Sequence, residues 1–246
     1  MCSWEDGNKV SKTLDAPDRW EVHAAERVVI TLGDFRVCTV QEPHGLTGGR
    51  IGVGACVWDG ALLLAGYLAS QPQYKFVGAR CIELGAGVGF VSSILAKMGA
   101  HVTASDIQKV LPLLERNLIE NDVLRKSHSF SGGWVEIEEL EWGKEGWMTR
   151  VETLRHPSPD YILAADCCYI DNDGISPSTP AFVQTCARLA GPNTTTLVAF
   201  ERRSPQIRKC FLDESSKLFT SVTKLSLNSL PIPLRLEYCD LWELKL

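Results

Sequence analysis

The sequence predicts an α/β protein with a doubly wound sheet, and three observations carry that prediction. From residue 80 onward, short apolar runs typical of strands alternate with segments of helical spacing. The run "DYILAADCCY" is almost continuously apolar, as a strand in the middle of a parallel sheet must be. The last two strands are joined by a connection too short for a crossover helix, so we expect them to pair antiparallel.

The first half of this alternation contains two strand–helix units. We expect strands at 80–85 and 101–106, each followed by a helix, at 90–99 and 109–122. Gly99 is a suitable C-terminal cap for the first helix. Pro112 is compatible with the second helix only within its first turn.

The second half continues the pattern to seven strands. Alternating polarity predicts a half-buried strand at 133–142, and the remaining predicted strands are 160–169, 194–203, 221–229 and 234–246. Helices are expected at 178–191 and 204–219. The second of these begins with Ser204 as N-cap and Pro205 in the first position.

The N-terminal part lies outside this alternation. Residues 1–20 are polar and mixed in charge, and we expect a loosely ordered leader. An N-terminal β-hairpin extension is predicted over 21–45, with its turn at Gly33-Asp34. A glycine-rich loop follows, and then a buried helix over 61–72. Because no repeat or low-complexity linker is present, residues 21–246 are interpreted as a single domain.

Composition limits the classes of function. The 246 residues are 45% hydrophobic, enough for a substantial core, and the formal net charge is −5. That charge argues against nucleic-acid binding by bulk electrostatics. No apolar run is long enough to cross a bilayer, and the first ten residues lack the apolar core of a signal peptide. We therefore expect no nucleic acid, no membrane, and a cytoplasmic or also nuclear location.

The nine cysteines do not form a metal-binding pattern. No C-x-x-C pair and no Cys/His spacing suited to zinc is present, so no metal site is predicted. Most cysteines are interpreted as small buried hydrophobes in a reducing compartment. Cys167 and Cys168 are adjacent, and a thiol-rich rim there would be open to oxidation.

The stretch "CIELGAGVG" is the strongest indication of a ligand. Gly85, Gly87 and Gly89 follow the first parallel strand, where a backbone free of side chains approaches a ligand closely. The spacing G-x-G-x-G differs from the dinucleotide fingerprint G-x-G-x-x-G. Glu83 would repel pyrophosphate but suit a sulfonium cation, and Asp106, ending the second strand, could accept both hydroxyls of a ribose. Together they indicate S-adenosyl-L-methionine.

Simpler interpretations of these residues stay open. The glycines could serve only a tight strand-to-helix turn, and Glu83 could be a buried acid bonded to loop amides. An NAD-dependent oxidoreductase is disfavoured by Glu83 and by the glycine spacing.

These motifs carry a family resemblance over residues 25–245. "CIELGAGVG", "HVTASD" and the closing strands resemble the seven-strand, class I methyltransferases, which have a Rossmann-like fold. Four further segments are similar to the family-16 protein-lysine methyltransferases: "GVGACVWDGALLLAGYL", "ELEWG", "PDYILAADCCY" and "FERR". Their order and spacing most resemble the branch that methylates valosin-containing protein, an AAA ATPase.

The resemblance implies a cofactor site. Trp58 would lie against the methionine end, the loop of Gly85, Ala86 and Gly87 beneath the cofactor, and Asp106 at the ribose. Trp142 would pack by the adenine, and Ala165 would contribute a backbone contact. Alternatively, Trp58 could be a core anchor for the helix after it, and Trp142 an ordinary aromatic at a strand end.

The resemblance also implies a catalytic pair in the D-x-x-Y motif, Asp166 and Tyr169. Asp166 would orient the lysine ammonium and accept hydrogen bonds from the amine, and Tyr169 would narrow the lysine channel. Both are positioning roles. Asp166 could instead be a capping or turn acid after a strand.

The implied function is protein-lysine methylation by a monomer acting on a protein substrate, with valosin-containing protein or another chaperone-like ATPase as the candidate. A methyltransferase for another protein residue or a small molecule is the alternative, as is a non-catalytic S-adenosylmethionine-binding module. The segment "IDNDGISPSTP" at 170–180 departs from the family, which has a more acidic, helix-starting stretch at this border of the substrate entrance.

Overall fold

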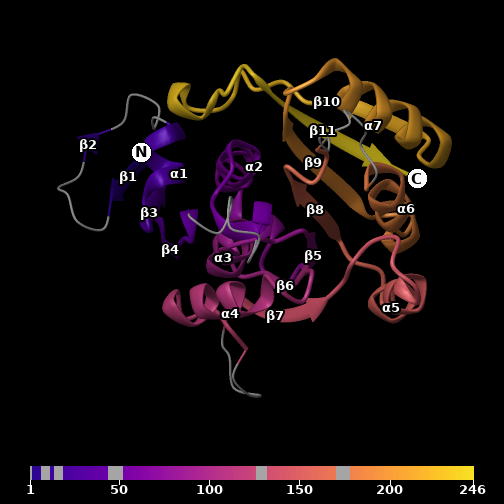
Figure 1. Ribbon diagram of the computed structural model, residues 1–246, viewed down its shortest axis with the longest axis horizontal. Helices are drawn as coiled ribbons and strands as arrows, with labels where there is room; N and C mark the ends of the chain where they lie inside the picture. Colours follow the sequence, from indigo (N-terminus) through magenta and orange to yellow (C-terminus); the bar gives the residue numbers. More distant parts are fainter. Residues whose placement is uncertain (1, 7–11, 14–18, 44–51, 126–131, 170–177) are drawn as a thin grey trace.

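A computed structural model of the chain describes residues 2–6, 12–13, 19–43, 52–125, 132–169 and 178–246. Its centre is a seven-stranded sheet in the order β10-β11-β9-β8-β5-β6-β7 (Figure 1). The strands are β5 (Arg80–Leu84), β6 (His101–Asp106), β7 (Trp134–Glu139), β8 (Tyr161–Ala165), β9 (Thr195–Glu201), β10 (Ser221–Lys224) and β11 (Cys239–Lys245).

Strand directions confirm the predicted doubly wound sheet. The pairs β7–β6, β6–β5, β5–β8 and β8–β9 are parallel. Strand β11 is antiparallel both to β9 and to β10, which confirms the antiparallel C-terminal pair. The strand order reverses between β5 and β8, and open α/β sheets bind ligands beyond the carboxyl ends of the strands at such a point.

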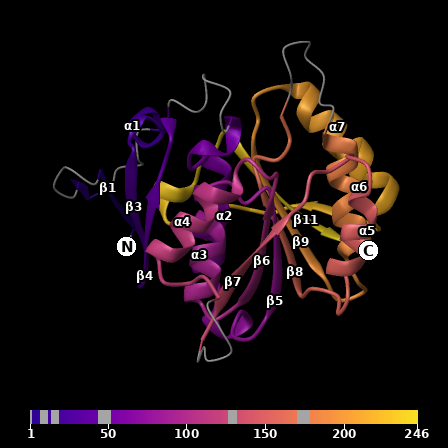
Figure 2. The ribbon, with the colours of Figure 1, turned by 60° about the horizontal axis from the view of Figure 1, so that its bottom comes forward.

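Helices cover both faces of the sheet (Figure 2). On one face lie α2 (Asp59–Ala69), α3 (Phe90–Lys97) and α4 (Leu111–Glu120), and on the other α5 (Trp147–Leu154), α6 (Thr179–Leu189) and α7 (Pro205–Leu218). Buried side chains form two apolar clusters, one on each side of the sheet. Because both faces of the sheet are covered, the middle strand β8 consists almost entirely of apolar residues.

Local signals set most helix ends where they were expected. The Ser204 hydroxyl oxygen accepts a hydrogen bond from the Gln206 N–H, and Pro205 occupies the first position of α7. Gly99 follows the end of α3 with a φ of +100°. Helix α5 was not predicted. It has only eight residues, and because only two of them are buried, it shows little apolar periodicity in the sequence.

The N-terminal hairpin is confirmed as β3 (Arg27–Leu32) and β4 (Phe35–Val40), joined at Gly33-Asp34. The expectation of a loosely ordered leader is wrong for residues 2–6, which form β1 (Cys2–Asp6) and pair antiparallel with β3. A two-residue strand, β2 (Lys12–Thr13), extends this sheet, and α1 (Arg19–Ala24) precedes β3. Pairing with β1 satisfies backbone groups of β3 that an isolated hairpin would leave open.

Two asparagines of α4 attach the N-terminal sheet to the main domain. The Asn117 side chain accepts a hydrogen bond from the Val40 N–H and donates to the carbonyls of Val40 and Val88. One turn later, the Asn121 side chain makes the same reciprocal pair with the backbone of Cys38. The two amides therefore replace a neighbouring strand along the edge of β4.

Replacing Asn117 with leucine should destabilise the protein strongly. The change leaves one buried N–H and two buried carbonyls without partners, at about 1–3 kcal/mol for each group. We expect the free energy of unfolding to fall by about 3 kcal/mol or more in urea titrations. Glu115→Leu, at an exposed position on the same helix, is the control and should change it by less than about 1 kcal/mol. Equal losses in the two variants would contradict the role given to Asn117.

Candidate functional site

A cavity of about 320 Å³ opens at the carboxyl ends of β5, β6 and β8. It lies where the topology places ligand sites and has the size of a small-molecule pocket. All ten residues proposed from the sequence line it: Trp58, Glu83, Gly85, Ala86, Gly87, Asp106, Trp142, Ala165, Asp166 and Tyr169. The individual roles assigned to them stay predictions.

The glycine loop is bent tightly around its neighbours. Gly85 has a φ of +65°, and a Cβ there would lie 2.7 Å from the Cys167 Sγ and 3.2 Å from the Trp142 ring. Gly87 has a φ of +54°, and its N–H donates to a carboxylate oxygen of Asp106 at 2.7 Å. The loop is therefore fastened to the end of β6, and both positions require glycine.

Asp106 combines two backbone contacts with a place in the cavity wall. Its Oδ2 accepts from the Gly87 N–H and its Oδ1 from the Ile107 N–H, both at 2.7 Å. Burial raises the pKa of this carboxyl, and the two N–H donors oppose the shift. A carboxylate oxygen has two lone pairs, so Asp106 keeps acceptor capacity for ribose hydroxyls.

The structure changes the interpretation of Glu83. Its side chain is buried, and its Oε2 accepts a hydrogen bond from the Ser92 hydroxyl of α3 rather than from loop amides. Burial raises the pKa of Glu83 to about 8, so the carboxyl is largely neutral at pH 7. A neutral Glu83 would not repel pyrophosphate. The preference for S-adenosyl-L-methionine over a dinucleotide therefore rests on the glycine spacing and on Asp106.

Two buried polar atoms in the cavity wall have no hydrogen-bond partner among the described residues. They are the Trp142 Nε1 and the Ser178 hydroxyl oxygen. The Trp142 ring is fixed against Phe182, with ring centroids 5.2 Å apart. Since buried polar groups are nearly always paired, these two atoms indicate a ligand that brings polar atoms next to Trp142 and Ser178.

Trp58 both lines the cavity and anchors the loop before α2. Its indole Nε1 donates to the Val53 carbonyl at 2.6 Å, and the His23 ring meets it edge-on at 4.8 Å. The Arg203 guanidinium lies over the ring, 4.5 Å from its centroid. The two interpretations of Trp58 are therefore compatible, because the anchored ring is also part of the wall.

Asp166 connects three elements around the cavity. Its Oδ2 accepts from the Gly60 N–H in the first turn of α2 at 2.6 Å, and its Oδ1 from the Glu201 N–H at the end of β9 at 2.9 Å. Its φ of +52° is unusual for a residue other than glycine. Burial raises the pKa of Asp166, and the Glu201 N–H and Arg203 oppose that shift. Asp166 is thus a capping acid that also faces the cavity.

The expectation of an oxidisable thiol rim is wrong. Cys167 and Cys168 are both buried, and the Cys167 thiol donates to the Leu84 carbonyl at 3.1 Å. Burial raises the pKa of Cys168 to about 12 and that of Cys167 well above its ordinary value. Thiols held in the protonated form are poor nucleophiles, so both cysteines serve as buried side chains, with the Cys167 thiol packed against Gly85 of the glycine loop.

Sequence reasoning gave no role to several wall residues, including Ser178, Arg203 and Lys109. Arg203 belongs to the quoted "FERR" segment, but its stacking on Trp58 depends on a contact across 145 positions of the chain. The segment 170–177, expected to border the substrate entrance, lies outside the described residues. Among the residues that are described, no cluster of metal-ligating side chains occurs, and no helix has the length and apolarity to cross a membrane.

The residues present fit S-adenosyl-L-methionine. Asp106 is suited to a ribose, the partnerless Trp142 and Ser178 to an adenine, and the glycine loop leaves space where side chains would intrude. Trp58 and Asp166 line the same cavity beside the start of α2.

Comparisons with known proteins agree with this geometry. Residues 46–222 match the sequence model of a family described as lysine methyltransferase (Methyltransf_16). The chain is similar to EEF1A lysine methyltransferase 3 of Xenopus tropicalis, at 31% identity over 63% of this chain and 61% of the relative. It is similar to protein N-lysine methyltransferase METTL21A of Danio rerio, at 32% identity over 70% and 71%. Protein-lysine methyltransferase METTL21E of Mus musculus shares 32% identity over 77% and 72%.

The matched part of the chain thus spans about three fifths to three quarters of these relatives. Among solved structures, the chain is similar to the 16S rRNA N2 G1207 methyltransferase RsmC of T. thermophilus, in complex with AdoMet and guanosine. The TM-score is 0.59 at 16% identity, over 89% of this chain and 50% of that one. Human methyltransferase-like protein 13 in complex with SAH gives a TM-score of 0.50 at 14% identity, over 78% and 83%. At these identities the solved structures show the fold alone.

The buried Glu83 should make the protein less stable as the pH rises. Between its ordinary pKa of 4.5 and about 8, the native state holds a proton that the unfolded chain has lost. The free energy of unfolding should therefore fall across this range, by up to about 1.4 kcal/mol per pH unit. Glu83→Gln, which retains an acceptor for Ser92, should remove that contribution.

Urea titrations of both proteins at pH 5.5, 6.5 and 7.5 measure the difference. Other buried acids contribute equally to the pH dependence of the free energy of unfolding in both proteins. The difference between the two slopes therefore reports on Glu83. The exposed substitution Glu115→Gln is the control and should follow the wild-type slope. Parallel slopes for wild type and Glu83→Gln would show that Glu83 titrates normally.

Proposed function

Because the chain belongs to the lysine methyltransferase family, we propose that it transfers methyl groups from S-adenosyl-L-methionine to the side-chain amine of a lysine in a target protein. One observation carries the proposal. The Asp166/Tyr169 pair shares a single cavity with the glycine loop and Asp106. The pair that we propose for a substrate amine thus lines the same cavity as the groups that we propose for a nucleoside.

The reaction requires positioning more than acid–base chemistry. When bound, S-adenosylmethionine supplies an electrophilic methyl group on a positively charged sulfur. The protein must hold a neutral lysine amine in line with that methyl group and keep water away from it. Val57, Ala86 and Val88 are buried apolar residues of the cavity wall, and we expect them to keep water away from the methyl group.

Asp166 is the residue best placed to orient the amine. Its carboxylate is fixed by the Gly60 and Glu201 N–H groups, so it cannot rotate away when a substrate enters. The remaining lone pairs can accept hydrogen bonds from a lysine amine. Tyr169, three residues on, narrows the same opening, and its ring can stabilise a cation.

The target protein is a finer proposal. The order and spacing of the four family segments support valosin-containing protein, while a similar relative that is named for EEF1A supports EEF1A as a second candidate. A cytoplasmic or nuclear location and a monomeric state are proposed with it. The composition, with a net charge of −5, supports a protein rather than a nucleic acid as substrate.

A transfer assay tests the activity and the target together. The purified chain is incubated with methyl-labelled S-adenosylmethionine and, in separate reactions, with valosin-containing protein, EEF1A and a cytosolic extract. We expect label in protein, with mass spectrometry locating it on a lysine. Label found only in small molecules, or on a different side chain, would refute lysine methylation. Label in EEF1A alone would move the target to the second candidate.

Substituting Asp166 should reduce turnover much more than cofactor binding. In Asp166→Asn an amide NH2 must face the Gly60 or the Glu201 N–H, so one of the two contacts is lost along with the charge. We expect kcat to fall by roughly 100-fold or more, which is typical for loss of a preorganised electrostatic contact. S-adenosylhomocysteine binding, measured by calorimetry, should change by less than about tenfold.

The matched control is Asp160→Asn. Asp160 immediately precedes the same strand, β8, but lies at its opposite end, where it accepts from the Arg80 N–H. This variant should keep its kcat within about threefold of wild type. If Asp166→Asn does the same, the positioning role is wrong.

A further inference from the structure

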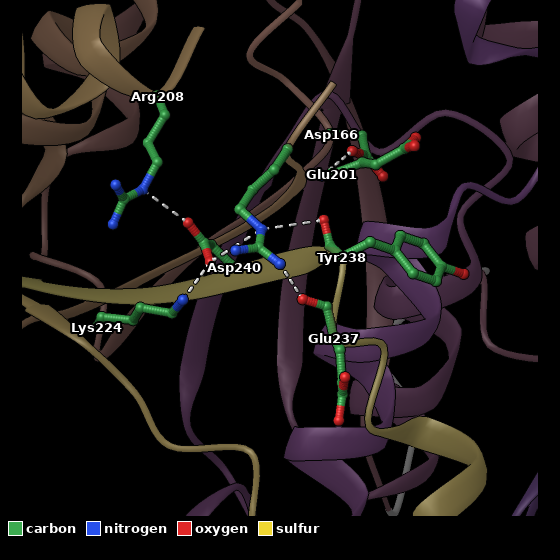
Figure 3. A network of polar contacts seen from close by, with 8 residues as sticks. Asp166, Glu201, Arg208, Lys224, Glu237, Tyr238 and Asp240 are labelled. Carbon is green, nitrogen blue, oxygen red and sulfur yellow. Dashed lines mark hydrogen bonds and ion pairs between the residues drawn. The ribbon is translucent and has the colours of Figure 1, made fainter. Parts of the chain in front are cut away.

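A second group of charges lies at the same edge of the sheet as the cavity, centred on Asp240 (Figure 3). The Asp240 side chain is completely buried, yet three cations contact its carboxylate. The Lys224 Nζ lies 2.5 Å from Oδ1, the Arg208 Nε 3.1 Å from Oδ2, and the Arg202 Nε 3.7 Å from Oδ1. One carboxylate therefore holds three side chains in fixed places.

The fold brings these side chains together from separate elements. Arg202 follows the end of β9, Arg208 lies in the first turns of α7, and Lys224 ends β10. Asp240 is at the start of β11, which runs antiparallel to both strands. All four thus lie at the carboxyl edge of β9, and Arg203, the neighbour of Arg202, lines the cofactor cavity.

The group carries more positive charge than Asp240 requires. Three cations against one carboxylate leave a net charge of +2, and the cation side chains are 42–44% exposed. Backbone contacts fix Arg202 further, through the carbonyls of Glu237 and Tyr238. Excess charge that is held in place and open to solvent is available to a partner.

Nearby acids leave this excess largely intact. Asp213 pairs with Lys209 on the exposed side of α7, and Glu201 pairs with Arg203. The Glu237 carboxylate points away from the cations (Figure 3). Beside the group, a hollow of about 450 Å³ is lined by Arg202, Ser204, Pro205, Arg208, Lys209, Leu212 and Asp213.

We propose that the three cations on Asp240, Arg202, Arg208 and Lys224, together with Lys209 of the adjoining hollow, form a docking surface for an acidic segment of the protein substrate. We call these four side chains the cationic rim. This cationic rim deepens the proposed function, on which it rests, by giving the substrate a chemical character. The target lysine would be flanked in sequence or in space by several aspartates or glutamates.

Electrostatics favours that partner over others. The chain as a whole carries a net charge of −5, so an acidic segment is repelled by most of the molecule and attracted at the cationic rim. A lysine approaching without acidic neighbours would itself be repelled by the rim. Acidic residues beside the lysine would offset this repulsion and fix the orientation of the substrate.

A binding experiment tests the rim without using activity. The probe is a fluorescein-labelled octaglutamate peptide, and its anisotropy is measured against the full chain at 50 and 200 mM salt. We expect saturable binding that weakens at higher salt. The double variant Arg208→Gln/Lys209→Gln should weaken it about tenfold or more, and an octaglutamine peptide should not bind.

Matched controls separate docking from folding. Lys217 is also an exposed lysine of α7 that pairs with an acid, but it lies at the far end of the helix. Lys217→Gln is therefore the matched control. It should bind octaglutamate as the wild type does. Lys209 pairs with the exposed Asp213 and not with the buried Asp240. The single variant Lys209→Gln therefore tests the rim even if the double variant does not fold. Thermal melting and S-adenosylhomocysteine binding report the integrity of each variant.

Methylation of extract proteins links the rim to the substrate. The Lys209→Gln and double variants should raise the KM for the labelled protein and leave kcat nearly unchanged, while Lys217→Gln changes neither. If wild type labels no protein, the proposed function fails, whereas the peptide measurement still reports on the rim. Octaglutamate binding that is absent, or equal in wild type and double variant, would overturn the proposal. So would tighter binding of a single-stranded oligonucleotide, because the rim would then fit a nucleic acid.

Discussion

The cavity depends on the two hydrogen bonds that the Asp166 carboxylate accepts. They join the end of β8 to the first turn of α2, through Gly60, and to the end of β9, through Glu201. A Cβ on Gly60 would lie 2.5 Å from Asp166 Oδ2, so α2 can approach this closely only because residue 60 is glycine. Trp58 immediately precedes α2 and Arg203 follows β9, so the same contacts set the distance at which these two side chains stack. One carboxylate thereby shapes the part of the cavity beside the start of α2.

Much of the fold and the outline of the site could be predicted because their causes are local. The glycines, Asp106 and the D-x-x-Y motif follow strands whose apolar runs are visible in the sequence, and parallel strands bring their carboxyl ends to one edge. The partners of these residues could not be predicted in the same way. Ser92 for Glu83 and Gly60 for Asp166 are contacts made by the packing of helices on the sheet. Helix α5 and strand β1 were missed for a similar reason, since short elements take their stability from tertiary contacts.

Burial also reversed two interpretations that rested on residue type alone. A glutamate in a binding motif suggests a negative charge, but the Glu83 side chain is 2% exposed, and its hydrogen bonds with Ser92 only partly offset the effect of burial, so it keeps its proton to about pH 8. Adjacent cysteines suggest reactivity, but the same desolvation raises the pKa of both thiols. In both cases the residue type sets the chemistry available, and the solvent exposure decides which form exists at neutral pH. Exposure is a tertiary property that a sequence pattern does not contain.

The carboxyl edge of the sheet therefore has two electrostatic regions with different tasks. Inside the cavity, Asp106 and Asp166 are held by backbone N–H groups that favour their charged forms against the cost of burial. Outside it, at the same edge of the sheet, the cationic rim presents an excess of positive charge. A positive field lowers the pKa of an arriving lysine, and a methyl acceptor must be the neutral amine. In the proposed reaction, the arrangement would meet two opposing requirements, because acidic neighbours would bring the lysine to the rim and the cations there would favour loss of its proton.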